Sequence, residues 1–245
     1  MVLFRIFAAS LLMVLPLLAQ PGRGGATMTH VHINSADPEA AIAFWTGALA
    51  VSGYSTGTMT GITMQGGVVL FSKAAPTGPS AGSAIEHIGI RVPDFAPLMA
   101  RLAKTSYKGS QATPGGPLLI EGPDGVRIEV VEDSDMYTVV EFGHVHVVGP
   151  KAAEMPAWYT ANLGARPGAD DTSVRIGGAL WFSKADAVVP TKGRAIDHIS
   201  VETRDLAAFT KKMGEVGIKL EATDKPKVMA MTDPSGMLIE VSEAQ

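Results

Sequence analysis

The sequence predicts an α+β fold in which a unit of one strand, one helix and several short strands occurs four times. Three observations predict it. The six histidines form one pattern that is written twice, helix-capping signals follow the histidine segments, and the other segments alternate apolar and polar residues as strands do. The chain contains no cysteine, which excludes disulfides, thiolate metal sites and cysteine nucleophiles.

The histidine pattern combines two kinds of histidine segment with a glutamate at nearly constant spacing. From the leading histidine, the gaps to the later histidine and then to the glutamate are 57 and 42 residues in the first copy, and 54 and 42 in the second. The copies are His30-Val31-His32, Glu86-His87-Ile88 and Ile128-Glu129-Val130, and then His144-Val145-His146, Asp197-His198-Ile199 and Ile239-Glu240-Val241.

Other residues repeat with the histidines and divide the chain. Gly66-Gly67 and residues 71–74 (Phe-Ser-Lys-Ala) recur as Gly177-Gly178 and residues 182–185. A boundary near residue 138 is therefore predicted, with one domain over 27–138 and a second over 139–245. Each domain divides again into two modules, at about 28–83 and 84–133 in the first, and about 140–193 and 194–243 in the second.

Residues 1–26 have the layout of a secretory signal peptide. One arginine precedes a mostly apolar run over 6–19, and small polar residues follow. We expect cleavage after Ala19 or Ala26 and a secreted or periplasmic protein with no stable membrane span after cleavage. The alternative is an uncleaved anchor, although a mostly apolar run of 14 residues is short for a bilayer.

Capping signals predict one helix after each histidine strand. Asp37 and Pro38 suit an N-cap and a first helical position. Pro156 lies awkwardly inside the third helix, so an irregular first turn is expected there. The predicted helices cover residues 40–49, 95–103 after Asp94, 151–163 after Gly149-Pro150, and 206–216 between a cap at Thr203 or Asp205 and Gly217.

The predicted strands carry the histidines and glutamates on one face and apolar residues on the other. Turn signals at residues 122–125 and 233–236 lead into the two strands that contain Glu129 and Glu240. Burying an ionised glutamate without a partner lowers the stability of the folded protein by several kcal/mol, on the order of the desolvation penalty for one charge. A divalent cation held by two histidines and one carboxylate would remove that cost. The alternative is a metal-free polar network that lines a ligand pocket.

With these motifs the chain resembles the vicinal oxygen chelate superfamily, which contains glyoxalase I, extradiol dioxygenases and bleomycin- and fosfomycin-resistance proteins. The resembling segments cover residues 28–243. The resemblance implies four βαβββ modules, paired into two cup-shaped mixed sheets with helices on the outer faces and a metal on the floor of each cup. The ligands carried over by position are His30, His87 and Glu129 in one cup, and His144, His198 and Glu240 in the other.

His32 and His146 lie two residues beyond the leading histidines on the same strand face. These two histidines could be extra metal ligands, proton-transfer groups or residues that hold the ligands in place. We predict that they transfer protons. The family pattern is incomplete elsewhere, because glyoxalase I has a further acid in a strand that here reads Val68-Val69-Leu70-Phe71-Ser72. None of the four tyrosines matches the tyrosine that extradiol dioxygenases use.

These expectations favour a metal-dependent enzyme that acts on a small oxygen-rich molecule chelated through two oxygens, as a dioxygenase or as a lyase or isomerase. Fe, Mn, Zn and Ni all accept this ligand set. The alternatives are a non-catalytic binding or sequestration protein, and a protein in which only one cup is active. A net charge of -4 without a basic block gives no support for nucleic-acid binding.

Overall fold

The structure, a computed structural model, describes residues 25–57 and 59–244. Apart from its last two residues, the predicted signal peptide at 1–26 lies outside the described residues. Among the helices of the described residues, none has the length and apolar character needed to cross a bilayer.

Four modules follow one another along the chain, each with one strand, one α-helix and three further strands. The first has β1 (Ala26–Ser35), α1 (Pro38–Ala48), β2 (Ser52–Thr56), β3 (Met59–Met64) and β4 (Gly67–Lys73). The second has β5 (Ile85–Val92), α2 (Phe95–Leu102), β6 (Gly109–Gln111), β7 (Leu118–Glu121), the 3-10 turn η1 (Pro123–Gly125) and β8 (Arg127–Glu132). The third has β9 (Glu141–Gly149), the 3-10 turn η2 (Ala152–Glu154), α3 (Met155–Leu163), β10 (Arg166–Pro167), β11 (Ser173–Arg175) and β12 (Ala179–Lys184). The fourth has β13 (Ile196–Thr203), α4 (Leu206–Glu215), β14 (Glu221–Ala222), β15 (Val228–Thr232) and β16 (Leu238–Glu243).

The modules form two open eight-stranded mixed sheets, which confirms the predicted α+β fold. The β1–β13 sheet has the order β14-β15-β16-β13-β1-β4-β3-β2 and joins the first module to the fourth. The β5–β9 sheet has the order β10-β11-β12-β9-β5-β8-β7-β6 and joins the second module to the third. Each sheet therefore takes its strands from both sides of the predicted boundary near residue 138.

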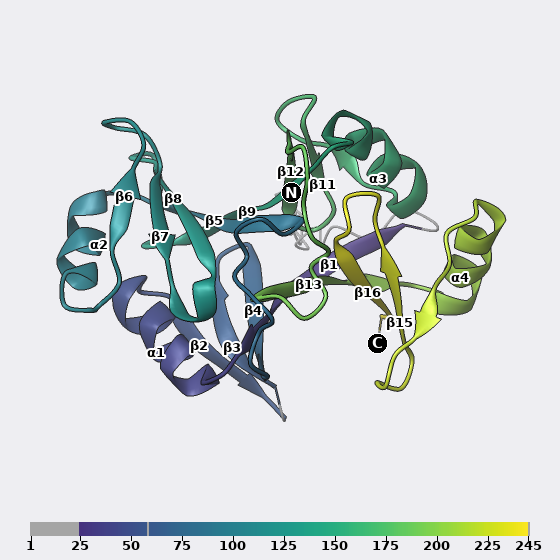
Figure 1. The fold of residues 1–245 in the computed structure, drawn as a ribbon, viewed down its shortest axis with the longest axis horizontal. Coiled ribbons are helices and arrows are strands. Elements are labelled where there is room, and N and C mark those ends of the chain that lie inside the picture. The colour runs from purple at the N-terminus through teal and green to yellow at the C-terminus, as the bar shows by residue number, and fades with distance from the viewer. Residues whose placement is uncertain (1–24, 58, 245) are drawn as a thin grey trace, which may run out of the picture.

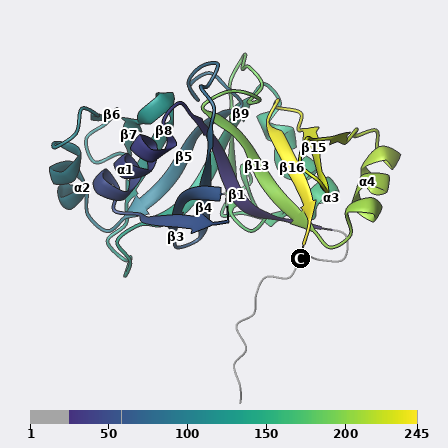
Figure 2. The ribbon, with the colours of Figure 1, turned by 90° about the horizontal axis from the view of Figure 1, so that it is seen from below.

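The two halves of the chain nevertheless occupy different ends of the molecule. Helices α1 and α2 lie at one end and α3 and α4 at the other, and both sheets run between these ends (Figures 1 and 2). The central strands β1 and β13, and β5 and β9, pair antiparallel where the halves meet. Paired residues of β1 and β13 are about 163 to 177 positions apart in the sequence, and those of β5 and β9 are about 50 to 62 positions apart.

The helices begin where the capping residues predict. Asp37 and Asp94 each accept a hydrogen bond from a backbone amide in the first turn, and Asp205 does so for α4. In the third module η2 precedes α3, and Pro156 occupies the first turn of α3. The expected irregular start of this helix is therefore present, because proline is accommodated where its missing N–H needs no partner.

One apolar core joins the sheets and the helices. The alternate residues that face away from the histidines in the central strands are fully buried in it, including Val31, Ile88, Val145 and Ile199. Trp45 in α1 and Tyr159 in α3 are buried in the same core, as their apolar neighbours predict. Because this face is buried under the helices, the opposite face of each strand is left for the polar side chains.

A buried aspartate links α3 to the turn before β16. Asp233 Oδ1 accepts hydrogen bonds from the amides of Ser235 and Met237, each at 2.9 Å. Its Oδ2 accepts from the Tyr159 hydroxyl at 2.9 Å. Burial raises the pKa of Asp233 from 3.8 to about 6, although these hydrogen bonds favour the ionised form.

We expect Asp233→Asn to flatten the pH dependence of stability between pH 4 and 7. The folded protein holds the Asp233 proton more tightly than the unfolded chain, so wild-type stability falls as pH rises from about 4 through 6. A difference of this size corresponds to roughly 3 kcal/mol. Urea unfolding at several pH values measures it, with the exposed Asp186→Asn as control. Parallel profiles for wild type and Asp233→Asn would contradict this assignment.

Candidate metal centres

The sheets gather the predicted site residues into two clusters. The β5–β9 centre comprises His87, His144, His146 and Glu129, and the β1–β13 centre comprises His30, His32, His198 and Glu240. In each centre the three histidines offer nitrogen atoms that lie within 4.8 Å of one another. All eight predicted residues therefore fall into one centre or the other.

The predicted grouping of these residues into cups is wrong. His30 was expected beside His87 and Glu129, but β1 and β5 lie in different sheets. His30 instead shares a centre with His198, and His144 shares one with His87, because β1 pairs with β13 and β9 pairs with β5. The second and fourth modules carry the same residue types at matching positions, so exchanging them leaves the ligand types of each cup unchanged.

Three potential ligand atoms converge in the β5–β9 centre. His87 Nε2 and His144 Nε2 lie 3.2 Å apart, and each lies 3.7 Å from Glu129 Oε1. Metal–ligand bonds of about 2.1 Å place neighbouring ligand atoms roughly 3 to 3.7 Å apart. The spacing of these three atoms therefore fits a first-row divalent metal.

A β-bulge orients His87 for this role. Ile85 pairs with Val147 and His87 with His146, so Glu86 is an extra residue in β5. The bulge lets the Glu86 carboxylate accept a hydrogen bond from His87 Nδ1, and Arg127 binds the same carboxylate. With its proton on Nδ1, neutral His87 directs the lone pair of Nε2 at Glu129 and His144.

Asp197 orients His198 in the same way. It is the extra residue in β13 between the pairs Ile33–Ile196 and His32–His198. Its carboxylate accepts from His198 Nδ1 at 2.6 Å, and Asn34 and the Gly193 amide donate to it as well. The buried Nε2 of His198 has no hydrogen-bond partner in the described part of the chain, although Glu240 Oε2 lies 3.2 Å away. This nitrogen and this carboxylate need a positive charge between them, either a proton or a metal ion.

The charges in the β5–β9 centre favour metal binding near neutral pH. Burial and the neighbouring His87 lower the pKa of His144 to about 3, so His144 is neutral. His87 lowers the pKa of Glu129, which is therefore ionised. Burial opposes the charged form of His87, but Glu129 and Glu86 outweigh burial and raise its pKa. Without a metal, the Nε2 proton of His87 supplies the positive charge that a metal ion would replace.

The β1–β13 centre contains an additional cation. Lys225 Nζ lies 2.8 and 3.0 Å from the two carboxylate oxygens of Glu240. Burial favours the protonated acid, but His198 and Lys225 lower the pKa of Glu240 to about 2. Burial and His198 lower the pKa of His30 to about 4. Glu240 is therefore ionised and already paired with a lysine.

His32 and His146 are held by serines that the repeat also contains. His32 Nε2 lies 2.6 Å from Ser72 Oγ, and His146 Nε2 lies 2.8 Å from Ser183 Oγ. In both rings Nδ1 is buried and has no hydrogen-bond partner among the residues that the structure describes. Burial lowers the pKa of both histidines, and that of His32 falls to about 3. A neutral ring with one free nitrogen is able to accept a proton, and this role for the two residues stays a prediction.

The β5–β9 centre depends on a glycine that sequence inspection passes over. A Cβ atom on Gly89 would lie 2.2 to 2.9 Å from atoms of the His144 ring. The other face of this ring stacks on Trp181, with centroids 4.0 Å apart and an interplanar angle of 8°. Trp181 itself is 39% exposed. His144 is thus clamped between a glycine and a tryptophan.

Each centre adjoins a cavity. A cavity of about 300 Å³ opens beside His144 and Trp181, and its wall includes Arg91 and Arg175. Arg91 is paired with Asp133 and Glu141, whereas Arg175 has no hydrogen bond or ion pair to any described residue. A cavity of about 500 Å³ adjoins the β1–β13 centre and is lined by His30, His32, Lys225 and Glu240 among others.

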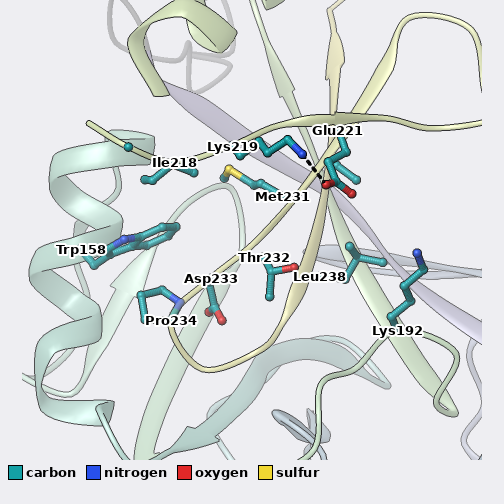
Figure 3. A pocket seen from close by; sticks show the side chains of 12 residues that line it. Trp158, Lys192, Ile218, Lys219, Glu221, Met231, Thr232, Asp233, Pro234 and Leu238 are labelled. Carbon is teal, nitrogen blue, oxygen red and sulfur yellow. Dashed lines mark hydrogen bonds and ion pairs between the residues drawn. The ribbon is translucent and has the colours of Figure 1, made fainter. Parts of the chain in front are cut away.

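A further cavity of about 540 Å³ lies away from both centres, beside α3 and the turn before β16 (Figure 3). Trp158, Ile218 and Met231 line it, together with an exposed pair between Lys219 and Glu221. No histidine lines this cavity. Its only buried ionisable group, Asp233, is engaged with the turn and with Tyr159, so we place the site in the sheets rather than here.

Glu86 and Asp197 are the site residues that sequence reasoning missed. Both copies place an acid directly before the second-segment histidine, which was a visible signal. Simple strand alternation assigns such an acid to the opposite face, and only the bulge returns it to the histidine. Carboxylates that fix the tautomer of a ligand histidine are typical of metal sites, and their presence supports the fit of a metal.

The sequence matches no protein-family model, and no curated protein matches it either. Solved structures share its fold. Glyoxalase I from Zea mays superposes with a TM-score of 0.65 at 15% identity, over 89% of this chain and 92% of that one. A putative dioxygenase from Bacillus subtilis gives 0.59 at 16% identity, over 91% and 86% of the two chains. The CppA protein from Streptococcus pneumoniae gives 0.56 at 13% identity, over 89% and 99%.

These similarities extend along nearly the whole described chain. At such low sequence identity they show that the fold is shared. They cover both sheets, so the shared architecture includes all four modules and not one pair of them. The predicted fold is thereby confirmed: this chain has the paired βαβββ fold that glyoxalase I from Zea mays also has.

Proposed function

We propose that the protein is an exported, metal-dependent enzyme that acts on a small oxygen-rich organic molecule chelated to the metal through two oxygen atoms. The observation that carries this proposal is the convergence of His87 Nε2, His144 Nε2 and Glu129 Oε1 within 3.7 Å of one another. Glu86 supports it by fixing the tautomer of His87. Export rests on the composition of residues 1–26 alone.

A divalent metal at this centre would supply a Lewis acid that stabilises negative charge on the substrate oxygens. The chain supplies the rest. Two histidines and one glutamate leave other coordination positions for substrate, as a site for Fe, Mn, Zn or Ni does. Arg175, which has no ionic partner among the described residues, faces the adjoining cavity and suits an oxygen-rich, anionic group.

His146 is the proton-transfer group that the geometry offers at this centre. Its ring centroid lies 4.5 Å from that of His87, so it is adjacent to the metal ligands. Its Nε2 is occupied by Ser183, and its Nδ1 is free. Burial and His87 lower the pKa of His146 and keep its ring neutral. If Nε2 donates its proton to Ser183, the lone pair of Nδ1 is the position that would accept a proton from a substrate.

A binding or sequestration protein is the second candidate. His146 is the sole free acid–base side chain that we identify at the β5–β9 centre, and none of the described tyrosines joins it. A protein of this kind would bind its ligand tightly without turnover. Screening of catechols under oxygen and of hydroxy and keto acids, with product analysis, separates the two functions.

Glu129→Gln is expected to remove the metal from the β5–β9 centre. The amide keeps the shape of the side chain but lacks the negative charge, and loss of a ligand lowers affinity by about 100-fold or more. Elemental analysis of protein purified without chelators measures this loss. Glu221→Gln, in an exposed pair with Lys219, is the matched control and should retain the metal. Equal metal content in both variants would contradict the assignment of Glu129.

Gly89→Ser should also weaken metal binding, although residue 89 is not a ligand. The new Cβ would occupy the space of the His144 ring and push its Nε2 away from His87 and Glu129. We expect a drop in metal affinity of about 10- to 100-fold, as for other changes that displace a ligand. Metal titration of Gly89→Ser beside the reverse change at the equivalent position, Ser200→Gly, tests this. Unchanged affinity in Gly89→Ser would show that His144 is not held by this contact.

A further inference from the structure

We propose that the two centres are not equivalent: the β5–β9 centre holds the metal, and Lys225 acts as a built-in cation that keeps the β1–β13 centre free of metal. This inference rests on the proposed metal function and specifies which of two similar centres carries it. It predicts one tightly bound metal ion per chain from a sequence that contains the ligand pattern twice.

The ammonium group of Lys225 forms hydrogen bonds with both carboxylate oxygens of Glu240, which are the atoms that would bind a metal. Both carboxylate oxygens lie within 3.0 Å of Nζ, so no oxygen of Glu240 is free of it. The Glu240 side chain is only 13% exposed, and the lysine is 46% exposed. A divalent ion at His198 and Glu240 would have to displace this ammonium group or lie close to it, and both are unfavourable.

The loop that carries Lys225 is fixed by hydrogen bonds. Thr223 Oγ1 accepts from the Lys225 amide at 3.1 Å, and its hydroxyl lies 3.2 Å from the Lys225 carbonyl and 2.9 Å from that of Val228. The lysine therefore reaches Glu240 from a tight connection between β14 and β15. A structured loop of this kind loses less conformational entropy when its side chain forms an ion pair.

The β5–β9 centre has no counterpart of this lysine. The equivalent connection, between β6 and β7, spans residues 112–117 and reads Ala-Thr-Pro-Gly-Gly-Pro. Within the described part of the chain, Glu129 forms ion pairs with His87 and His144 and with no lysine or arginine. Its carboxylate is therefore open to a metal ion.

A second difference concerns the leading histidine of each centre. Gly89 makes room for His144, whereas the equivalent residue opposite His30 is Ser200, which carries a Cβ. His144 Nε2 lies 3.7 Å from Glu129 Oε1, but across residues 25–57 and 59–244 no ring nitrogen of His30 lies within 4.0 Å of a carboxylate oxygen of Glu240. His30 Nδ1 instead lies 3.1 Å from Thr29 Oγ1. Among the described residues, the leading histidine therefore lies within 4.0 Å of the glutamate in the β5–β9 centre and not in the β1–β13 centre.

Titration with Zn²⁺ alone, monitored by calorimetry and by elemental analysis after dialysis, tests this inference on the full chain. Wild type should bind one equivalent tightly, and His87→Ala should lose it while His198→Ala keeps it. Lys225→Met, which retains the aliphatic stem, should gain a second equivalent. The affinity of this second site should rise by about 10- to 100-fold over wild type, which is the range for loss of a competing charged hydrogen bond.

The matched control is Lys219→Met, which removes a lysine from another lysine–glutamate pair near β14. It should leave the stoichiometry at one. His198→Ala added to Lys225→Met should abolish the second equivalent, and thermal unfolding verifies that each variant is folded. Two equivalents in wild type, or one equivalent in Lys225→Met, would overturn the inference and leave the proposed metal function intact. Absence of metal from every variant would instead contradict the proposed function.

Discussion

The antiparallel pairing of β5 with β9, and of β1 with β13, is the constraint on which the rest of the structure depends. Each histidine that points out of these strands meets a histidine from a different module, and the parallel neighbour in the sheet brings the glutamate beside them. The opposite strand face is buried in the core under the helices. The polar side chains therefore lie on the remaining face of each sheet, where the histidine lone pairs and the negative charge of the glutamate are close together. A buried imidazole lone pair facing a carboxylate is costly unless a positive charge lies between them.

The two centres differ in the positive charge that balances the glutamate. In the β1–β13 centre the lysine ammonium group sits on Glu240, and the charge of the carboxylate is balanced within the chain. In the β5–β9 centre the ionic partners of Glu129 among the described residues are histidines, so a proton on His87 or a metal ion must supply the charge. Duplication gave both centres the same residue types, and a lysine in one loop and a glycine in one strand separate them. The difference between a metal centre and an ion pair thus arises outside the repeated motif.

Much of the fold could be predicted from the sequence because its signals are local. Asp37, Asp94 and Asp205 marked helix starts, Pro156 marked an irregular turn, and alternation gave the buried face of each central strand. The grouping of modules could not be predicted, because His87 with Glu129 and His198 with Glu240 are interchangeable in type and spacing. The roles of Glu86 and Asp197 were missed because a bulge overrides alternation. Lys225 was missed because its contact with Glu240 depends on the loop between β14 and β15, which lies outside the repeat.

Anomalous diffraction at the zinc absorption edge, from crystals of the full chain grown with Zn²⁺, would show which of the two centres holds a metal ion. We expect one strong peak per chain, between His87, His144 and Glu129, with Lys225 still paired to Glu240. A peak of equal height beside His198 and Glu240 would contradict the assigned difference between the centres. A map without a peak at either centre, from protein shown to be folded and exposed to saturating Zn²⁺, would contradict the metal centre itself.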